Sequence, residues 1–360
     1  MRKPRQPLDI KRMTRKPEAH GIMRTHEGRK MQPLLEISYL LRSRFRVHDI
    51  VGSGGFGQIF KGVDKMTGHN FAIKICMAEE EGNRLIIEQR VMAKLNGKDN
   101  FPFMVASGAL HLPHRPKCHY IIMELLGPSL AILRKGNQSR RFSIGTALRV
   151  GEQCVDAMEV MHLGGYLHRD IKPSNMCIGL AQFGKHRTVF IIDFGMARKY
   201  LQPNGQLRKE RGRAAFRGTT RYVSLTVHDR KETGPVDDLW SLYYSIIELG
   251  EGVLPWRMKL KQKDVEDMKR KSTFTDLCKR FPTQFYEFEK FLHHLKWSDI
   301  PKYQSLKEIL RVSYPKNNSN YLLDILRSAI LPNNQRKRHS NGRERLEILH
   351  KEKYCNQLLL

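Results

Sequence analysis

The stretch LHRDIKPSN at positions 167–175 places a carboxylate, an ammonium group and an amide in one short segment. Asp170 could accept a hydrogen bond from a hydroxyl group and then take its proton. Lys172 could reach a terminal phosphate, and the amide oxygen of Asn175 could bind Mg²⁺, a hard cation that prefers oxygen ligands. Transfer of a phosphoryl group requires such a set, because catalysis then consists of positioning, charge neutralisation and metal binding.

A second carboxylate follows in the sequence IIDFG at 191–195, where Asp193 ends an apolar run. Asn175 and Asp193 are therefore the predicted metal ligands, for Mg²⁺ or alternatively Mn²⁺. Each motif alone has a plain structural explanation, since an Asp–Lys pair is usually a surface ion pair and D-F-G can be a turn. Their order along one chain favours the catalytic interpretation, in which His168 holds the loop and Asp170 is the base.

A glycine-rich stretch, VGSGGFGQI at 51–59, fits the pattern G-x-G-x-x-G. A dinucleotide-binding fold is the alternative, but it needs a helix at the third glycine, and the following QIFKGVD is typical of a strand. Strand–turn–strand geometry predicts a flap whose backbone N–H groups cover the phosphates of ATP. The predicted nucleotide-binding residues of this flap are Val51, Gly52, Ser53, Gly54, Gly55, Phe56, Gly57, Gln58 and Ile59.

The next apolar strand ends in FAIK and carries Lys74. This lysine could face water on an edge strand, or it could hold the α- and β-phosphates with a carboxylate beside it. Glu88 is the favoured partner because it lies within an apolar-periodic helix, whereas the three glutamates at 79–81 precede that pattern.

Strand patterns dominate the first third of the folded region, and helical patterns dominate the rest. Ser143 is a candidate N-cap, and the segment 235–250 predicts a helix buried on nearly all sides. The sequence therefore predicts an α+β fold with a small β-rich N-lobe and a larger α-helical C-lobe. The expected parts are a basic flexible arm at 1–40, a catalytic domain at 41–332 with lobes at about 41–124 and 127–332, and a basic tail at 333–360.

The composition is strongly basic, with 64 Lys and Arg against 36 Asp and Glu and a formal net charge of +28. An acidic partner is expected, such as an acidic or phosphorylated protein or a tubulin-like polymer surface. No zinc-finger, RNP-like or homeodomain pattern is present, so specific nucleic-acid binding is not expected. The absence of a long apolar run predicts no transmembrane helix, and six scattered cysteines predict reduced thiols in an intracellular protein, cytoplasmic or, through its basic arms, nuclear.

These motifs together resemble eukaryotic protein kinases over roughly residues 44–330. MELLGPSL, HRDIKPSN and RGTTRYVSL are similar to the casein kinase I superfamily, and FRGTTRYVSLTVHDR…DDLWSLYYSIIELGEGVLPWR is most similar to its tau-tubulin kinase branch. The resemblance implies a bilobal kinase fold, a monomer, and transfer of phosphate from ATP to Ser or Thr of proteins. It also implies that Met123 gates the adenine pocket, that Ala72 lines the nucleotide site, that Glu124 to Leu126 form the hinge, that Thr219 contacts Asp170, and that Asp238 braces the catalytic loop.

The predicted activation segment is basic and lacks the usual A-P-E motif, for which SLTVH stands in. How this segment is anchored is left open. Because guanidinium groups bind carboxylate and phosphate in bidentate fashion, acidic or already phosphorylated substrates are expected. A kinase fold acting only as a scaffold or basic binding module is the alternative, but Lys74, Asp170 and Asp193 are all present. The basic residues are Arg198, Lys199, Arg208, Lys209, Arg211, Arg213, Arg217 and Arg221.

Overall fold

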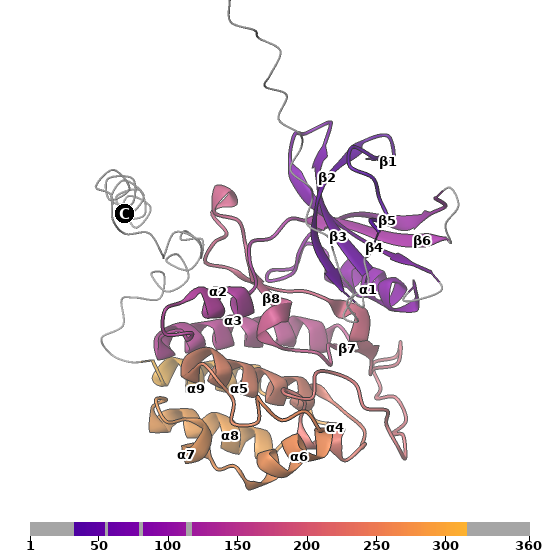
Figure 1. Cartoon of the computed structure of the whole chain (residues 1–360). Coiled ribbons are helices and arrows are strands. Elements are labelled where there is room, and N and C mark those ends of the chain that lie inside the picture. The colour runs from indigo at the N-terminus through magenta and orange to yellow at the C-terminus, as the bar shows by residue number, and fades with distance from the viewer. Residues whose placement is uncertain (1–31, 55–56, 79–81, 113–116, 315–360) are drawn as a thin grey trace, which may run out of the picture.

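The computed structural model describes residues 32–54, 57–78, 82–112 and 117–314. A curled sheet with one helix lies above a larger helical part (Figure 1). The predicted α+β architecture with two lobes is confirmed. The predicted tail at 333–360 and most of the predicted arm lie outside the described residues.

The N-lobe is built on a six-stranded sheet in the order β1-β2-β3-β4-β6-β5, and all its pairs are antiparallel. On β3, buried residues alternate strictly with partly exposed ones, as expected for a strand with one face on a core. The helix α1 packs against this sheet and ends before Gly97, whose φ of +77° suits glycine. The elements are β1 Leu40–Leu41, β2 Phe45–Gly54, β3 Gly57–Asp64, β4 Asn70–Met77, α1 Gly82–Leu95, β5 Met104–Leu110 and β6 Cys118–Glu124.

The segment before β1 belongs to the N-lobe, which differs from the expectation of a flexible arm up to residue 40. Leu35 is 1% exposed and packs in the same apolar cluster as Phe45 and Phe60. Ser38 N donates to Val47 O at 2.8 Å, so the backbone here is tied to β2. The run of basic residues ends at Lys30, and the apolar run LLEISYLL at 34–41 marks where packing starts, so the predicted arm extended too far.

The C-lobe is organised around α5, the predicted buried helix. Of its residues only Trp240 and Glu251 are not fully buried, and its side chains pack against α3, whose N-cap is Ser143 as predicted. The helix ends one residue later than predicted, at Glu251, because Gly252 at φ +92° provides the C-cap. The other elements are α2 Leu130–Gly136, α3 Ile144–Leu163, β7 Tyr166–Leu167, β8 Met176–Ile178, β9 Val189–Ile191, β10 Arg198–Lys199, α4 Leu225–His228, α5 Pro235–Glu251, α6 Gln262–Lys271, α7 Phe274–Leu277, α8 Tyr286–His293 and α9 Tyr303–Val312.

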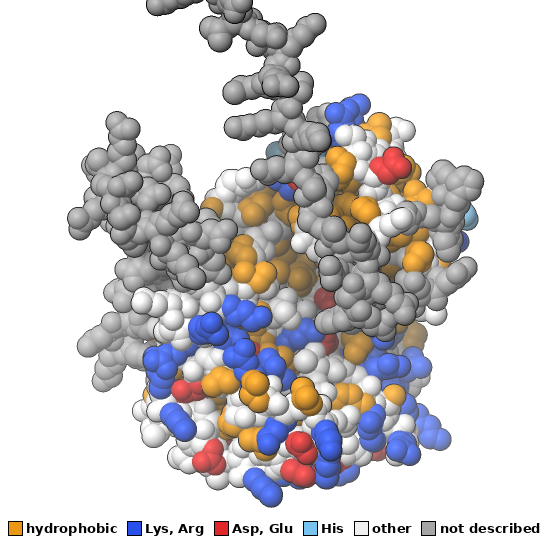
Figure 2. Space-filling view, viewed as in Figure 1, with side chains coloured by type: hydrophobic (Ala, Val, Ile, Leu, Met, Phe, Trp, Pro, Cys, Tyr) orange, Lys and Arg blue, Asp and Glu red, His pale blue; other side chains and the backbone are white. Residues whose placement is uncertain are grey.

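Two further features bear on the predictions from composition. The five described cysteines are buried, and none of them forms a disulfide within the described residues. In the part of the chain that the structure describes, no helix combines the length and apolar character needed to cross a bilayer. On the face shown in Figure 2, blue Lys and Arg side chains are spread over the C-lobe, with acidic side chains between some of them.

We expect the stability of the protein to depend on pH because of His228, which lies at the end of α4. The side chain is 5% exposed, and neither ring nitrogen has a hydrogen-bond partner within the described residues. Burial, with a smaller contribution from Lys269, lowers the pKa of His228 to about 4, although Glu266 acts in the opposite direction. The unfolded chain therefore takes up this proton first, near its ordinary value of about 6.5.

We expect the free energy of unfolding to fall by up to about 3 kcal/mol relative to His228→Phe as pH drops from 6.5 to 4. Above pH 6.5 the side chain is neutral in both the folded and the unfolded chain, so the difference between the two proteins is constant there. Urea unfolding at stepped pH measures this difference. The same replacement at His48, which is exposed, is the control; equal pH profiles of wild type and His228→Phe would contradict the prediction.

Candidate active site

Lys74 connects three elements that come from both lobes. Its Nζ lies 2.6 Å from Glu88 Oε2 on α1 and 3.0 Å from Asp193 Oδ1, which follows β9. The side chains of Lys74 and Glu88 are 7% and 3% exposed, so this ion pair is shielded from water. The choice of Glu88 over the glutamates at 79–81 agrees with this contact; those three lie outside the described residues.

The charge states of this cluster follow from its contacts. Burial disfavours the ammonium of Lys74, but the Glu88 and Asp193 carboxylates outweigh it and raise the pKa of Lys74 above its usual value. Burial likewise works against the ionised form of Asp193, but Lys74 and, more weakly, Lys172 lower its pKa. The site therefore keeps a fixed ammonium beside ionised carboxylate oxygen.

Asp170 is the centre of a second cluster in the loop after β7. Thr219 donates to Asp170 Oδ1 from both its backbone N, at 3.0 Å, and its Oγ1, at 2.7 Å. Lys172 Nζ lies 2.7 Å from Asp170 Oδ2 and 3.0 Å from Thr219 Oγ1. The contact between Thr219 and Asp170 that the resemblance implied is therefore present, and it joins the loop to the activation segment.

Asp238, near the start of α5, holds the catalytic loop from within the C-lobe. Its two carboxylate oxygens accept from the backbone N of His168 and of Arg169, each at 2.7 Å. His168 accepts from Asp170 N through Nδ1 and lies 3.1 Å from the Ile192 carbonyl through Nε2. A carbonyl can only accept, so His168 carries its proton on Nε2 and is neutral. It holds the loop, as predicted, and has no free nitrogen for proton transfer.

The predicted metal ligands offer oxygen atoms that suit a hard cation. Asn175 uses its Nδ2 to donate to the Asp170 carbonyl at 2.9 Å, and within the described residues its Oδ1 makes no hydrogen bond. Asp193 Oδ1 likewise accepts from Lys74 Nζ, and within the described residues its Oδ2 has no hydrogen-bond partner. An amide and a carboxylate oxygen fit Mg²⁺ or Mn²⁺ bound partly through nucleotide phosphates and water. Among the described residues no group of three His, Cys, Asp or Glu forms a self-contained metal site.

The described flap and hinge positions lie on β2, on β3 and at or just after the end of β6, and β4, which carries Lys74, lies between β3 and β6 and is not an edge strand. Ile59 pairs with Lys74, and Ala72 pairs with Met123 on the neighbouring strand. Gly57 has φ +105°, and a Cβ there would lie 2.3 Å from the Ile75 carbonyl, so only glycine allows this close hairpin. Val51 is exposed, and Gly55 and Phe56 lie outside the described residues. The other predicted flap positions, Gly52, Ser53, Gly54 and Gln58, lie on this hairpin. Glu124 is the last residue of β6, and Leu126 comes just after it.

Two predicted positions have side chains with other partners. Gln58 faces away from the site and is 2% exposed. Glu124 lies 2.7 Å from Lys185 and accepts from the backbone N of Phe103 at 3.2 Å. The backbone N of Glu124 also donates to the Phe103 carbonyl at 2.8 Å, so neither its side chain nor its N–H is left for a nucleotide base.

The activation segment is anchored by two glutamates that sequence reasoning missed. Glu232, 4% exposed, accepts a bidentate pair from Arg211 at 2.7 Å for both bonds and a bond from Arg198 at 3.2 Å. Glu248 on α5, 1% exposed, accepts from Tyr222 Oη at 2.5 Å. These contacts supply the anchoring that the missing A-P-E motif had left open.

The backbone of the same segment is held from a third side. Lys269 on α6 donates to the carbonyls of Thr220 and Val223 at 2.9 and 2.5 Å. Trp256 Nε1 donates to the carbonyl of Arg221 at 2.9 Å. No sequence pattern marked Glu232, Glu248 or Lys269, because a charged residue in a helix or loop is usually solvated.

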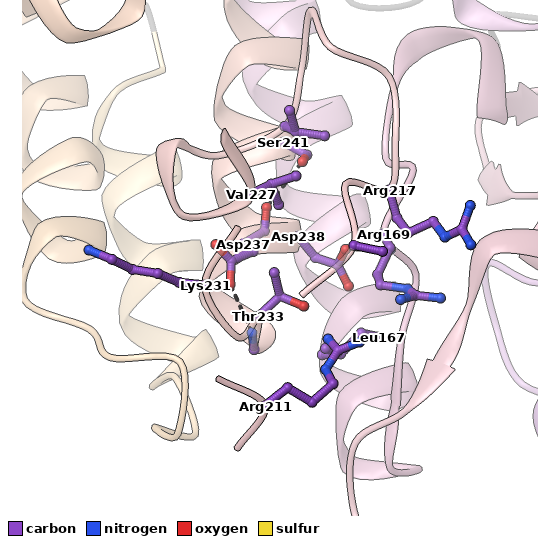
Figure 3. A pocket seen from close by; sticks show the side chains of 13 residues that line it. Leu167, Arg169, Arg211, Arg217, Val227, Lys231, Thr233, Asp237, Asp238 and Ser241 are labelled. Atoms are coloured by element: carbon purple, nitrogen blue, oxygen red, sulfur yellow. Dashed lines mark hydrogen bonds between the residues drawn. The ribbon is translucent and has the colours of Figure 1, made fainter. Parts of the chain in front are cut away.

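An arginine cluster lies between the catalytic loop and the activation segment. Arg169, Arg211 and Arg217 line one pocket. Lys231 lines it too, but Figure 3 shows its side chain pointing away from the three arginines. Burial, with smaller contributions from Arg211 and Arg217, lowers the pKa of Arg169 to about 10. Asp238 acts in the opposite direction but does not outweigh the effect of burial. Glu232 compensates Arg211, whereas within the described residues the side chains of Arg213 and Arg217 form no ion pair and are exposed.

Comparison with known proteins agrees with this geometry. Residues 45–348 match the protein kinase domain family. A Dictyostelium discoideum protein named as a serine/threonine-protein kinase is 38% identical over 276 residues, 76% of this chain and 54% of that protein. A Caenorhabditis elegans protein named as a casein kinase I is 37% identical over 221 residues, 61% of this chain and 63% of that protein. A second C. elegans protein, named as a serine/threonine-protein kinase, is 33% identical over 281 residues, 77% of this chain and 79% of that protein.

The chain thus spans about half the length of the Dictyostelium relative and less than two thirds of the first C. elegans relative. The family match covers both lobes, and the sheet, helices and clustered motif residues form the bilobal kinase fold that the sequence predicted. By this match and this fold, the chain belongs to the protein kinase domain family.

Proposed function

We propose that the protein is a serine/threonine kinase that transfers the γ-phosphoryl group of ATP to hydroxyl groups of protein substrates, with Asp170 as the general base. The observation that carries this proposal is the convergence of Lys74, Glu88 and Asp193 beside the Asp170 cluster. The two clusters are adjacent, since Asn175 donates to the Asp170 carbonyl and accepts at 3.0 Å from the backbone N of Ile192, the residue before Asp193. The names of the relatives support the choice of Ser and Thr.

Each residue has a role that its contacts allow. Lys74, fixed by Glu88, holds the α- and β-phosphates, and Asp193 and Asn175 hold Mg²⁺, which neutralises phosphate charge when bound. Movement of Lys172 toward the γ-phosphate releases Asp170 Oδ2, which it contacts at 2.7 Å. That oxygen then accepts the proton of the substrate hydroxyl, while Thr219 keeps Oδ1 oriented.

A phosphorylation screen on a peptide array with purified protein, labelled ATP and Mg²⁺ or Mn²⁺ tests the proposal. We expect labelling of Ser and Thr peptides, and none with Asp193→Asn. We also propose the finer assignment to the casein kinase I superfamily and its tau-tubulin kinase branch, which the name of one relative supports at the level of casein kinase I. Absence of labelling across the array would instead favour a scaffold.

We further propose that substrates are acidic or already phosphorylated, and that Arg213 and Arg217 recognise them. Arg211 belongs to the same basic segment, but its guanidinium is already paired with Glu232. Arg213 and Arg217 are exposed on the same segment with no such partner among the described residues. Free guanidinium groups beside the loop that holds Asp170 suit carboxylate or phosphate on a peptide.

The double replacement Arg213→Glu/Arg217→Glu should raise KM for an acidic peptide about tenfold, because two attractive charges become repulsive. KM for a neutral peptide and for ATP should change little. The control Lys94→Glu/Lys98→Glu makes the same change in net charge on the N-lobe, where both lysines are exposed. Equal effects of the two variants would show that net charge, and not this site, determines the preference.

A further inference from the structure

Gln58, the residue after the third glycine of the flap, is bound to the chain that precedes the sheet. Leu34 N donates to Gln58 Oε1 at 2.7 Å, and Gln58 Nε2 donates to the Gln32 carbonyl at 2.9 Å. The amide thus bonds to the backbone on either side of Pro33, using one acceptor and one donor, as a residue of a neighbouring parallel strand would. The Gln58 side chain itself is 2% exposed, although Gln32 and Pro33 are exposed.

The two faces of β3 give this contact its significance. Ile59 is paired with Lys74, and directly opposed residues share a face, so Ile59 lies on the nucleotide face. Successive side chains point to opposite faces, so Gln58 and Phe60 lie on the outer face. Gln58 is therefore next to Gly57, where the flap begins, but reaches away from the nucleotide.

The segment that Gln58 binds is itself fixed. Leu35 is 1% exposed and belongs to the outer apolar cluster with Phe60, Ile73 and Ile75. Residues 32–35, called the N-terminal strap below, therefore have one firm attachment to the sheet and one polar attachment to the root of the flap. A hydrogen bond pair of this kind restricts the position of the strand that carries Gly57.

We propose that Gln58 is a positioning residue that fixes the root of the nucleotide flap to the N-terminal strap, so that affinity for ATP depends on the strap. This inference rests on the proposed kinase function. The residue acts through the flap backbone and does not touch the nucleotide, so its loss affects ATP binding more than the steps at Asp170. No sequence pattern marks this role, since Gln58 looks like any polar flap residue.

Replacement of Gln58 by Met keeps the size of the side chain and removes both bonds. We expect KM for ATP to rise about fivefold, with kcat and KM for peptide within twofold of wild type. Leu34→Pro removes the N–H that donates to Gln58 from the strap side, and should raise KM for ATP similarly. Because both changes break the same contact, the double variant should raise it no further than the larger single effect.

The control is Asn96→Leu, because Asn96 makes the same two-way pairing with a backbone in the N-lobe, to Met104 at 2.9 and 3.3 Å. It lies away from the flap, so KM for ATP should not change. Binding of a fluorescent ATP analogue to each protein is measured in parallel. No binding by wild type would refute the kinase proposal itself, whereas binding and transfer by wild type with unchanged KM in both Gln58→Met and Leu34→Pro would overturn only this inference. Lower melting temperatures without a change in KM, or an equal rise in Asn96→Leu, would also overturn it.

Discussion

Asp170→Asn should reduce kcat for phosphoryl transfer by about a thousandfold while the dissociation constant for ATP stays within about threefold of wild type. The amide keeps the size of the side chain and can still accept from Thr219 at the Oδ1 position. It cannot take a proton from the substrate hydroxyl, and an NH₂ group at the Oδ2 position would face the Lys172 ammonium. Single-turnover transfer to peptide and fluorescent-nucleotide binding measure the two quantities separately.

The matched control is Asp49→Asn, which removes one exposed carboxylate from β2 of the N-lobe. Its kcat should equal that of wild type. Retention of more than about a tenth of wild-type kcat by Asp170→Asn would mean that general base catalysis contributes little or comes from another group. Loss of nucleotide binding in the same variant would instead mean that the carboxylate is needed to hold the loop.

The contacts at the centre of the site could be predicted from the sequence because phosphoryl transfer restricts which residue types can meet. Lys74 and Asp193 are far apart in the chain, yet one reaction requires both beside the same phosphates, and the structure brings them to 3.0 Å. The fold followed from local patterns as well, since alternation on β3 and all-round apolar character on α5 each have one simple structural explanation.

The supporting contacts could not be predicted, because they depend on which side chains meet in three dimensions. Arg211 and Arg213 look alike in the sequence, but only Arg211 meets Glu232. Gln58 lies in a flap motif that is read for its glycines, and only the position of the strap shows its partners. Leu35 stands in the apolar run LLEISYLL that directly follows the basic residues, and the predicted arm was extended through it to residue 40, so its burial in the N-lobe was also missed.

Glu248→Ala should lower the free energy of unfolding by about 3 kcal/mol and raise KM for peptide substrates. The carboxylate lies 3.5 Å from Arg134 and 3.4 Å from Arg221, and its removal leaves the Arg134 guanidinium, whose side chain is 4% exposed, with backbone carbonyls as its only partners among the described residues. A buried charge that loses its partner costs several times more than a surface pair.

The effect on substrate follows from the position of Tyr222, which Glu248 ties to α5 three residues after Thr219. Without this bond the stretch around Tyr222 loses its tie to α5 and keeps only the backbone contacts from Lys269 and Trp256 near it, so peptide binding weakens while KM for ATP stays unchanged. Urea unfolding and steady-state kinetics give the two results. The control Glu287→Ala breaks only an exposed pair with Lys290. It should lower the free energy of unfolding by no more than a few tenths of a kcal/mol and leave KM for peptide unchanged. If Glu248→Ala were as stable as Glu287→Ala, Glu248 would not be the anchor that stands in for the missing A-P-E motif. A large loss of stability with unchanged KM for peptide would instead confine the role of Glu248 to the core of the C-lobe.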